Sequence, residues 1–162
     1  MTARQSHQRV LAIDPTSRGF GYVVLEADDL LVDWGARQLR GEKNTACVAA
    51  VMRLIERYEP DLLVLEDGTA TGSRRCQRVQ QLIDRLAELA RRNGIRVRWI
   101  SRVKVKKAFA SLGASTKHQI ALAIAARFPE LAYQLPRARK PWMSEDCRMA
   151  IFDAAAFALA FF

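Results

Sequence analysis

The sequence has little cysteine and little histidine, and these shortages exclude several kinds of site. The three cysteines, Cys47, Cys76 and Cys147, lie far apart and form no CxxC pair. This pattern argues against a disulfide framework or a zinc site and favours a reducing cytoplasm. Neither a GxxxxGKS loop nor an HExxH motif is present, and His7 and His118 are expected on the surface. A serine or cysteine nucleophile would therefore have no plausible general base.

Long hydrophobic runs are also missing. Only four apolar residues separate the polar start MTARQSHQR from Asp14, too few for the core of a signal peptide. The apolar segment 149–162 is too short to cross a bilayer and contains an acid. We therefore expect a soluble cytoplasmic protein that makes no membrane contact.

The composition and charge set the remaining bounds. Half of the 162 residues are hydrophobic and 27% are charged, so we expect one folded domain spanning residues 1–162. There are 26 Lys and Arg residues against 17 Asp and Glu, which gives a net charge of +9. This excess favours an anionic partner, but by itself it does not distinguish nucleic acid from a membrane surface.

The order of the predicted elements indicates an α/β fold. Strands are expected at 10–13, 19–25, 30–39, 62–65 and 95–100, and helices at 44–58, at 79–92 before Asn93-Gly94, and near 102–110, 116–128 and 145–161. Three strands in succession, followed by alternating helices and strands, predict a five-stranded mixed sheet with helices on both faces.

Three acids occur in apolar surroundings. Asp14 ends the strand VLAI, Glu66 ends LLVL, and Asp153 is the sole polar residue among 149–162. A carboxylate in such a setting is costly unless it is paired or binds a metal. Each acid could cap a helix or pair with an arginine. A shared site for Mg²⁺, with Mn²⁺ as a substitute, is the alternative that we favour, because hard divalent cations take oxygen ligands. Two such ions can clamp a phosphodiester during hydrolysis.

Four segments resemble those of the RuvC-type Holliday-junction resolvases of the RNase H-like superfamily. They are AIDPTSRGFGYVV at 12–24, LLVLED at 62–67, VKKAFASLGASTKHQIALAIAARFP at 105–129 and FDAAAFAL at 152–159. The resemblance implies an RNase H-like fold with Asp14, Glu66 and Asp153 as catalytic metal ligands. It also implies that Lys117 is catalytic and lies near the scissile phosphate.

The same resemblance implies partners. Lys106 and Lys107 would lie along bound DNA, and the helix near 74–93 would form a homodimer contact. The expected activity is Mg²⁺-dependent nicking of four-way junctions and other branched DNA, in recombination and repair.

The chain departs from the family pattern in its last acidic helix. The family usually carries an acid or His three residues before the final Asp, where this chain has Ala150. On a continuous helix Asp146 would share the face of Asp153 about 10.5 Å away. It could bind metal through water, or it could stabilise the helix N-terminus together with Ser144 and Glu145. On that helix Glu145 would face elsewhere.

A second departure is the loop 67–73, which has no aromatic residue where resolvases often carry one that wedges into the junction. Three arginines follow the loop, and we expect them to contact DNA: Arg74, Arg75 and Arg78.

Basic residues dominate the second half of the chain. Between 89 and 129 there are ten Lys or Arg residues and no acid. A charge run is often only a solvated helix face, which suits Arg91 and Arg92. From this segment and from a second patch that also holds Trp142, we predict DNA contacts by Arg102, Lys104, Lys106, Lys107, Lys117, Arg137, Arg139 and Lys140.

The leading hypothesis is therefore a metal-dependent endonuclease acting on branched DNA. One alternative is a RuvC-like protein that binds structured DNA without cutting it, which Ala150 and the missing aromatic favour. A YqgF-type nuclease acting on RNA is another. An actin-like ATPase would need two lobes, and 162 residues are too few for them.

Overall fold

A five-stranded sheet forms the centre of the computed structural model, which describes residues 7–70 and 73–162. The strands are β1 (Arg9–Pro15), β2 (Gly19–Glu26), β3 (Leu30–Gln38), β4 (Leu62–Glu66) and β5 (Arg96–Ile100), in the order β3-β2-β1-β4-β5. β2 is antiparallel to both of its neighbours, whereas β4 is parallel to both β1 and β5. The central strands β1 and β4 are buried on both faces, which explains their continuous apolar runs.

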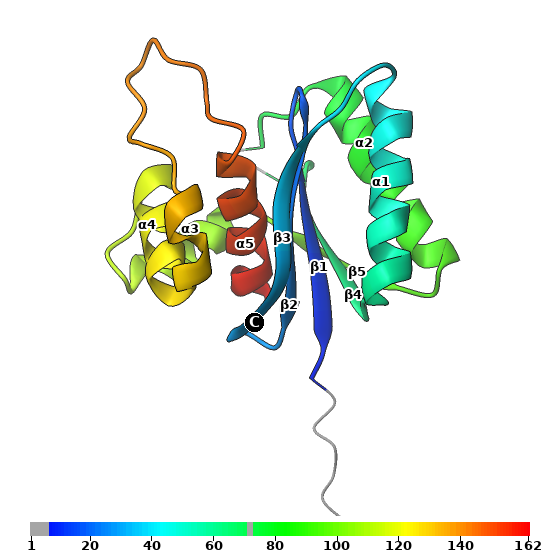
Figure 1. Cartoon of the computed structure of the whole chain (residues 1–162), viewed down its shortest axis with the longest axis horizontal. Coiled ribbons are helices and arrows are strands. Elements are labelled where there is room, and N and C mark those ends of the chain that lie inside the picture. The colour runs from blue at the N-terminus through cyan, green and yellow to red at the C-terminus, as the bar shows by residue number, and fades with distance from the viewer. Residues whose placement is uncertain (1–6, 71–72) are drawn as a thin grey trace, which may run out of the picture.

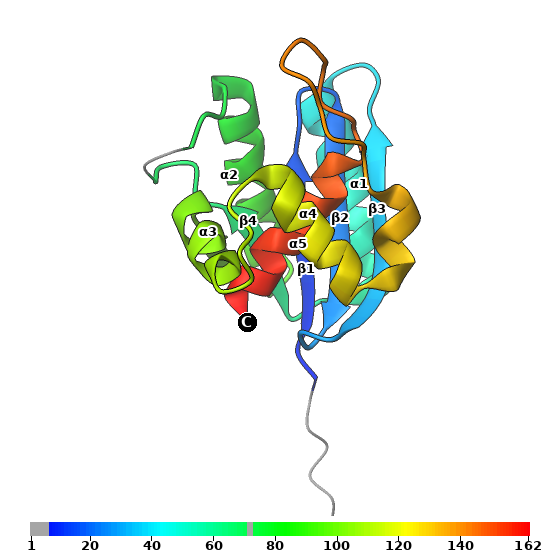
Figure 2. The same ribbon diagram turned by 90° about the vertical axis from the view of Figure 1, so that its left-hand side faces the viewer.

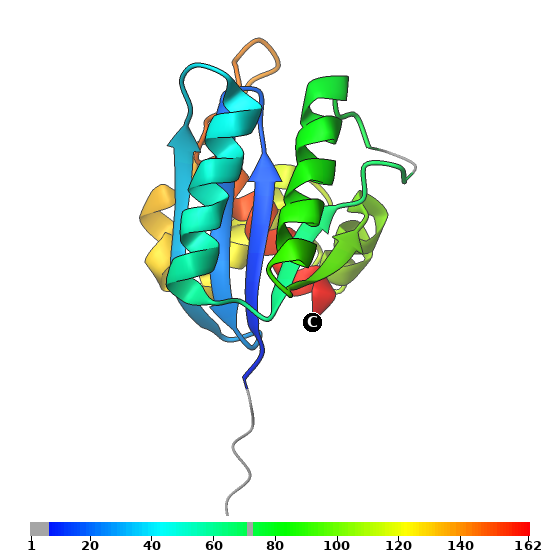
Figure 3. The same ribbon diagram turned by 90° about the vertical axis from the view of Figure 1, so that its right-hand side faces the viewer.

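Helices cover both faces of the sheet, as the sequence predicts. α1 (Lys43–Tyr58) and α2 (Gln77–Arg92) lie on one face (Figure 3). The other face is covered by α3 (Arg102–Ala110), α4 (Lys117–Arg127), the 3₁₀ helix η1 (Pro129–Gln134) and α5 (Met149–Phe161) (Figures 1 and 2). α5 lies directly on β1 and β2 beneath α4, and nearly all of its residues are buried.

The last helix begins later than predicted. The expected helix 145–161 starts at Met149, so the predicted helical placement of Asp146 and Glu145 is wrong. The Asp146 carboxylate accepts hydrogen bonds from the backbone N–H of Arg148 at 2.9 Å and from its guanidinium. This local bonding holds 146–148 in a turn, because a short acidic side chain competes for backbone donors that a helix would otherwise orient.

The topology brings the three acids with apolar neighbours, Asp14, Glu66 and Asp153, to one edge of the sheet. β1 and β4 are parallel, so Asp14 and Glu66 lie at the same ends of adjacent strands. Gly21 of β2 is the register partner of Asp14, and a Cβ on it would lie 2.2 Å from the carbonyl carbon of Ala150. Glycine at this position therefore lets the start of α5 approach the sheet closely and brings Asp153 to the same edge.

Across residues 7–70 and 73–162, no helix has the length and apolar character that a bilayer span needs.

Candidate active site

Three buried carboxylates mark the candidate site. Asp14 is 2% exposed, Glu66 is 1% exposed and Asp153 is 9% exposed. Asp14 and Asp153 line a cleft of about 310 Å³. The cleft also exposes cationic side chains and the segment before α5, including Arg18, Arg75, Arg102, Lys117, Ser144, Glu145 and Asp146. Buried carboxylates surrounded by cations are typical of a site built for charged chemistry.

Arg75 bridges two of the carboxylates. Its guanidinium forms ion pairs with Asp14 through Nη2 and with Glu66 through Nε, and its Nη1 donates to the carbonyl oxygen of Pro15 at 2.6 Å. Arg102 Nε donates to the other oxygen of Glu66 at 2.7 Å. Both oxygens of Glu66 are therefore engaged by arginines, and Arg75 is directed inward rather than toward solvent.

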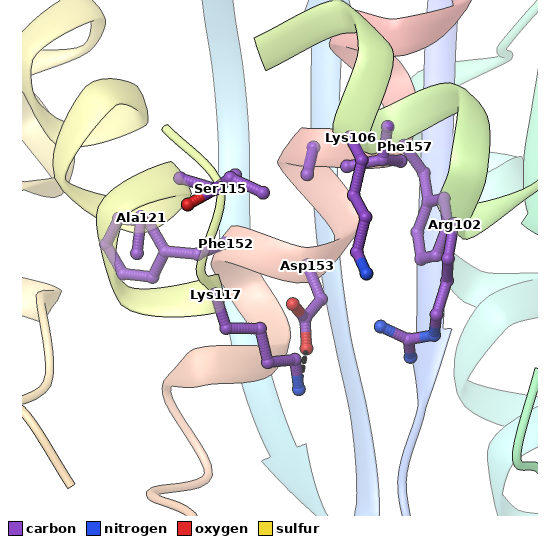
Figure 4. Close-up of a pocket in the computed structure, with 11 residues that line it drawn as sticks. Arg102, Lys106, Ser115, Lys117, Ala121, Phe152, Asp153 and Phe157 are labelled. Carbon is purple, nitrogen blue, oxygen red and sulfur yellow. Dashed lines mark ion pairs between the residues drawn. The ribbon is translucent and has the colours of Figure 1, made fainter. Parts of the chain in front are cut away.

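Lys117 holds the third carboxylate. Its Nζ lies 2.9 Å from Oδ2 of Asp153 and 2.8 Å from Oε1 of Glu145. Figure 4 shows Lys117 on one side of Asp153, with Arg102 and Lys106 directed toward it from the other. Lys117 is the first residue of α4, where a Thr116–Gln119 capping box fixes the start of the helix. The lysine is therefore placed by a well-defined helix terminus.

Burial and neighbouring charge shift the ionisation of these groups. Burial raises the pKa of Asp153 to about 7, the charge of Asp14 adds to the rise, and Lys117 opposes it. Burial also raises the pKa of Asp14, against the lowering effect of Arg75. Burial alone would lower the pKa of Lys117, but the charges of Asp153 and Glu145 outweigh it and raise that pKa. The lysine is therefore held as a cation beside the carboxylates.

Glu145 belongs to this group, although the sequence predicts that it faces elsewhere. That prediction depends on a helix through residue 145, and the structure has none there. The segment before α5 instead turns Glu145 toward Lys117. Only the adjacent sequence Ser144-Glu145-Asp146 could have hinted at this, because the contact depends on how the segment folds back.

Two residues near the start of α5 have other partners. Asp146 lines the cleft, but its carboxylate is occupied by Arg148, which lowers its pKa. Ala150 is buried against Gly21 and brings no ligand atom. A direct role for Asp146 as a metal ligand is neither required nor favoured by these contacts.

The loop after Glu66 provides mostly internal contacts. Asp67 accepts from the backbone and the hydroxyl of Thr69, while Thr71 and Gly72 of the predicted loop lie outside the described residues. Arg74 is exposed, whereas Arg78 donates to Asn44 at 2.8 Å and to the carbonyl oxygen of Thr16. DNA contact by the exposed Arg74 stays a prediction, whereas Arg75 and Arg78 bond to other parts of the protein itself.

The remaining predicted DNA contacts lie on two sides of the cleft. On α3, Lys104, Lys106 and Lys107 are exposed, and Lys106 lines a small hollow of about 70 Å³ next to Asp153. On the other side Arg137, Arg139 and Lys140 are exposed in the segment that precedes α5. These two basic surfaces flank the buried carboxylates.

A divalent metal suits the donor set in its chemistry. Asp14, Glu66 and Asp153 offer carboxylate oxygens alone, which Mg²⁺ and Mn²⁺ prefer. Each is already paired with at least one side-chain cation, which balances its negative charge. Within the described ranges, no group of three or more His, Cys, Asp or Glu is gathered closely enough to hold a metal ion. A metal would therefore have to displace Arg75.

The predicted dimer helix presents a polar outer face. α2 buries Val79, Leu82, Ile83, Leu86 and Ala90 against the protein. None of the large hydrophobic side chains exposed in the described part of the chain lies on α2. A homodimer contact through 74–93 stays a prediction.

Comparison with solved structures identifies the fold. A structure described as T. thermophilus RuvC in complex with Holliday junction substrate matches with a TM-score of 0.66 and 20% identity, covering 95% of this chain and 92% of that one. A second structure of RuvC from Thermus thermophilus gives 0.66 and 21%, covering 94% and 92%. The yeast mitochondrial Holliday junction resolvase Ydc2 gives 0.61 and 15%, covering 96% and 78%.

Sequence comparison adds nothing to this result, because no protein-family model and no curated protein matches the chain. The chain has a RuvC-like, RNase H-like fold, as the four motifs predict.

Proposed function

We propose that this RuvC-like chain is an endonuclease that hydrolyses phosphodiester bonds in branched DNA such as four-way junctions. A fold hosts many functions, so the proposal rests on the site. The observation that carries it is the meeting of Asp14, Glu66 and Asp153 at one sheet edge beside Lys117, between two basic surfaces. Neutral or anionic small molecules would not need cations spread over both sides of the cleft.

Asp14, Glu66 and Asp153 are the residues that would hold Mg²⁺, or Mn²⁺ in its place. When bound, such an ion supplies an activated water and polarises the phosphate. The protein's own part is to carry the three carboxylates on β1, β4 and α5, and the side chain that would have to move on metal binding is Arg75.

Lys117 has the second role. Its ammonium would donate to a non-bridging oxygen of the reacting phosphate, where negative charge develops. Asp153 and Glu145 hold the ammonium in place, and the start of α4 adds the partial positive charge of a helix N-terminus. Exposed cations would bind phosphates on either side: Lys104, Lys106, Lys107, Arg137, Arg139 and Lys140. Arg102, which the sequence also predicts on DNA, is instead held by Glu66.

Nicking of a synthetic four-way junction in Mg²⁺ or Mn²⁺ tests the proposal. We expect Asp14→Asn, Glu66→Gln and Asp153→Asn each to lower the nicking rate by at least about a hundredfold, because each removes a charged ligand oxygen. Asp29→Asn, which changes an exposed acid in the β2–β3 turn, is the matched control and should nick like the unmodified chain. Nicking that survives all three site changes would contradict the assignment of these residues. Comparison with an RNA junction of the same shape shows whether RNA is the preferred substrate.

A second candidate is a protein of this fold that binds branched DNA without cutting it. Two observations favour it: Arg75 already neutralises Asp14 and Glu66, and Ala150 supplies no fourth ligand. This candidate predicts salt-sensitive junction binding with no nicking by the unmodified chain in either metal. Nicking that depends on Asp14 excludes it.

A further inference from the structure

The segment between η1 and α5, residues 135–148, carries an unusual exposed aromatic side chain. We refer to these residues as the 135–148 loop. The loop contains no helix or strand, and it projects beyond the sheet edge at which β1 and β4 end (Figures 1–3). Trp142, in the middle of this segment, is 78% exposed. In the part of the chain that the structure describes, no other large hydrophobic side chain is as exposed.

Residues 140–143 of the loop form an ordered turn. The backbone N–H of Met143 donates to the carbonyl oxygen of Lys140 at 3.0 Å, which places Pro141 and Trp142 at the two central positions. Proline at the first central position sets the backbone angle that such a turn needs. Arg139 adds a bond from its guanidinium to the carbonyl oxygen of Met143 at 3.1 Å. The turn therefore fixes the backbone that carries the exposed indole.

One cation lies over the indole, and two more are exposed in the same loop. Lys140 Nζ lies 5.3 Å from the centroid of the Trp142 ring. Arg137 and Arg139 are exposed in the same loop, and no acid lies between Leu135 and Ser144. An exposed aromatic face among phosphate-binding cations is the combination that single-stranded or unpaired nucleotides use, with bases stacking on the ring and phosphates on the cations.

The loop is continuous with the candidate active site. At its far end Ser144 and Glu145 line the cleft of the buried acids, and Glu145 contacts Lys117. An adjoining hollow of about 680 Å³ is lined by Lys117, Arg137, Arg139 and Met143, among others. A DNA strand that reaches Asp153 can therefore run through this hollow to the turn.

We propose that Trp142 stacks on an exposed nucleobase of bound DNA and makes the chain select branched over linear duplex. The proposal rests on the proposed function for the identity of the ligand as DNA. Bases within a continuous duplex offer no free face to the indole, whereas bases at a branch point or in a single strand do. Lys140, Arg137 and Arg139 hold the flanking phosphates, which both kinds of DNA possess, so they contribute affinity without selecting.

The test compares binding to a four-way junction with binding to a linear duplex of the same sequence, in EDTA so that no strand is cut. We expect Trp142→Ala to weaken junction binding about tenfold, with less than a twofold effect on the duplex. Trp142→Phe should keep most of the preference, because it retains an aromatic face. Tyr133→Ala, which removes another exposed aromatic (69%) from η1, is the control and should change neither affinity.

Two further arms separate the possible explanations. The fluorescence of a 2-aminopurine base placed at the branch should be quenched when the unmodified chain binds and should not be quenched when Trp142→Ala binds. Lys140→Gln should weaken junction and duplex equally. Equal loss on both DNAs by Trp142→Ala, or no loss, would overturn the stacking role. The binding comparison needs no cleavage. If the chain binds junctions without nicking them, the endonuclease proposal fails and the stacking role of Trp142 can still be tested.

Discussion

Single residues at the site are governed by the cost of buried charge. Asp14 and Glu66 are almost fully buried, and the ion pairs with Arg75 offset that cost. Removing one partner of such a pair typically destabilises a protein by about 3–5 kcal/mol, because it leaves the other charge unpaired. Arg75 thus stabilises the folded protein when no metal is bound. It also occupies carboxylate oxygens that a divalent cation would use.

Asp153 makes stability depend on pH. Its pKa is about 7 in the folded protein, against an ordinary value of 3.8. The folded state therefore binds this proton more tightly than the unfolded state does. The resulting stabilisation is fully present below about pH 4 and is lost as the pH rises through about 7. Asp153→Asn removes this dependence.

We expect the free energy of unfolding of Asp153→Asn, relative to the unmodified chain, to increase between pH 4 and pH 7. This difference in the free energy of unfolding between the two proteins rises by at most about 1.4 kcal/mol per pH unit, and it stays constant above pH 8. Urea unfolding at four pH values measures it, with Asp29→Asn as the exposed control. A difference that does not change with pH would show that Asp153 is ionised throughout.

The sequence predicted the acids of the site better than it predicted their partners. Asp14, Glu66 and Asp153 stand out because an acid beside an apolar run is a local feature of the chain. The contacts of Arg75 and Glu145 join segments that are far apart in sequence, so no local pattern contains them. The sequence therefore predicts that Arg75 contacts DNA, whereas the structure pairs it with Asp14 and Glu66.

At the scale of elements, the site depends on how closely α5 packs on β2. A Cβ on Gly21 would lie 2.2 Å from the carbonyl carbon and 2.5 Å from the Cβ of Ala150. Backbone cannot move aside as a flexible side chain can. Gly21→Ala should therefore push α5 outward and lower the free energy of unfolding by about 3 kcal/mol, which chemical denaturation measures.

The control for this prediction is Gly35→Ala on β3. The nearest atoms to the added Cβ would belong to the ring of Tyr22, at 2.9 Å, which is a side chain rather than backbone. We expect Gly35→Ala to lower the free energy of unfolding by less than half as much as Gly21→Ala does. Equal losses from the two variants would mean that helix–sheet contact at Gly21 is not special.

The elements themselves were largely predictable. Continuous apolar runs gave β1 and β4, and helical spacing with Asn93-Gly94 gave α2. The start of α5 was not predictable from the same signals. Ser144, Glu145 and Asp146 look like a helix N-terminus, yet Asp146 bonds to Arg148 and delays the helix by four residues.

Over the whole molecule, charge is separated by the topology. Parallel β1 and β4 bring acids to one edge, while α3 and the 135–148 loop place cations on two sides of it. The net charge of +9 predicted an anionic partner, and the fold shows where that charge gathers. Its division into two flanking surfaces follows from chain connections that composition does not contain.

The central claim is that Asp14, Glu66 and Asp153 together bind the metal of a phosphodiester-cleaving site. Anomalous scattering from Mn²⁺ in crystals of the protein with a four-way junction tests this claim most directly. We expect a Mn²⁺ peak between the three carboxylates, with the Arg75 guanidinium withdrawn from Asp14 and Glu66. Saturating Mn²⁺ that leaves Arg75 bridging both acids, with no peak among the three carboxylates, would contradict the account.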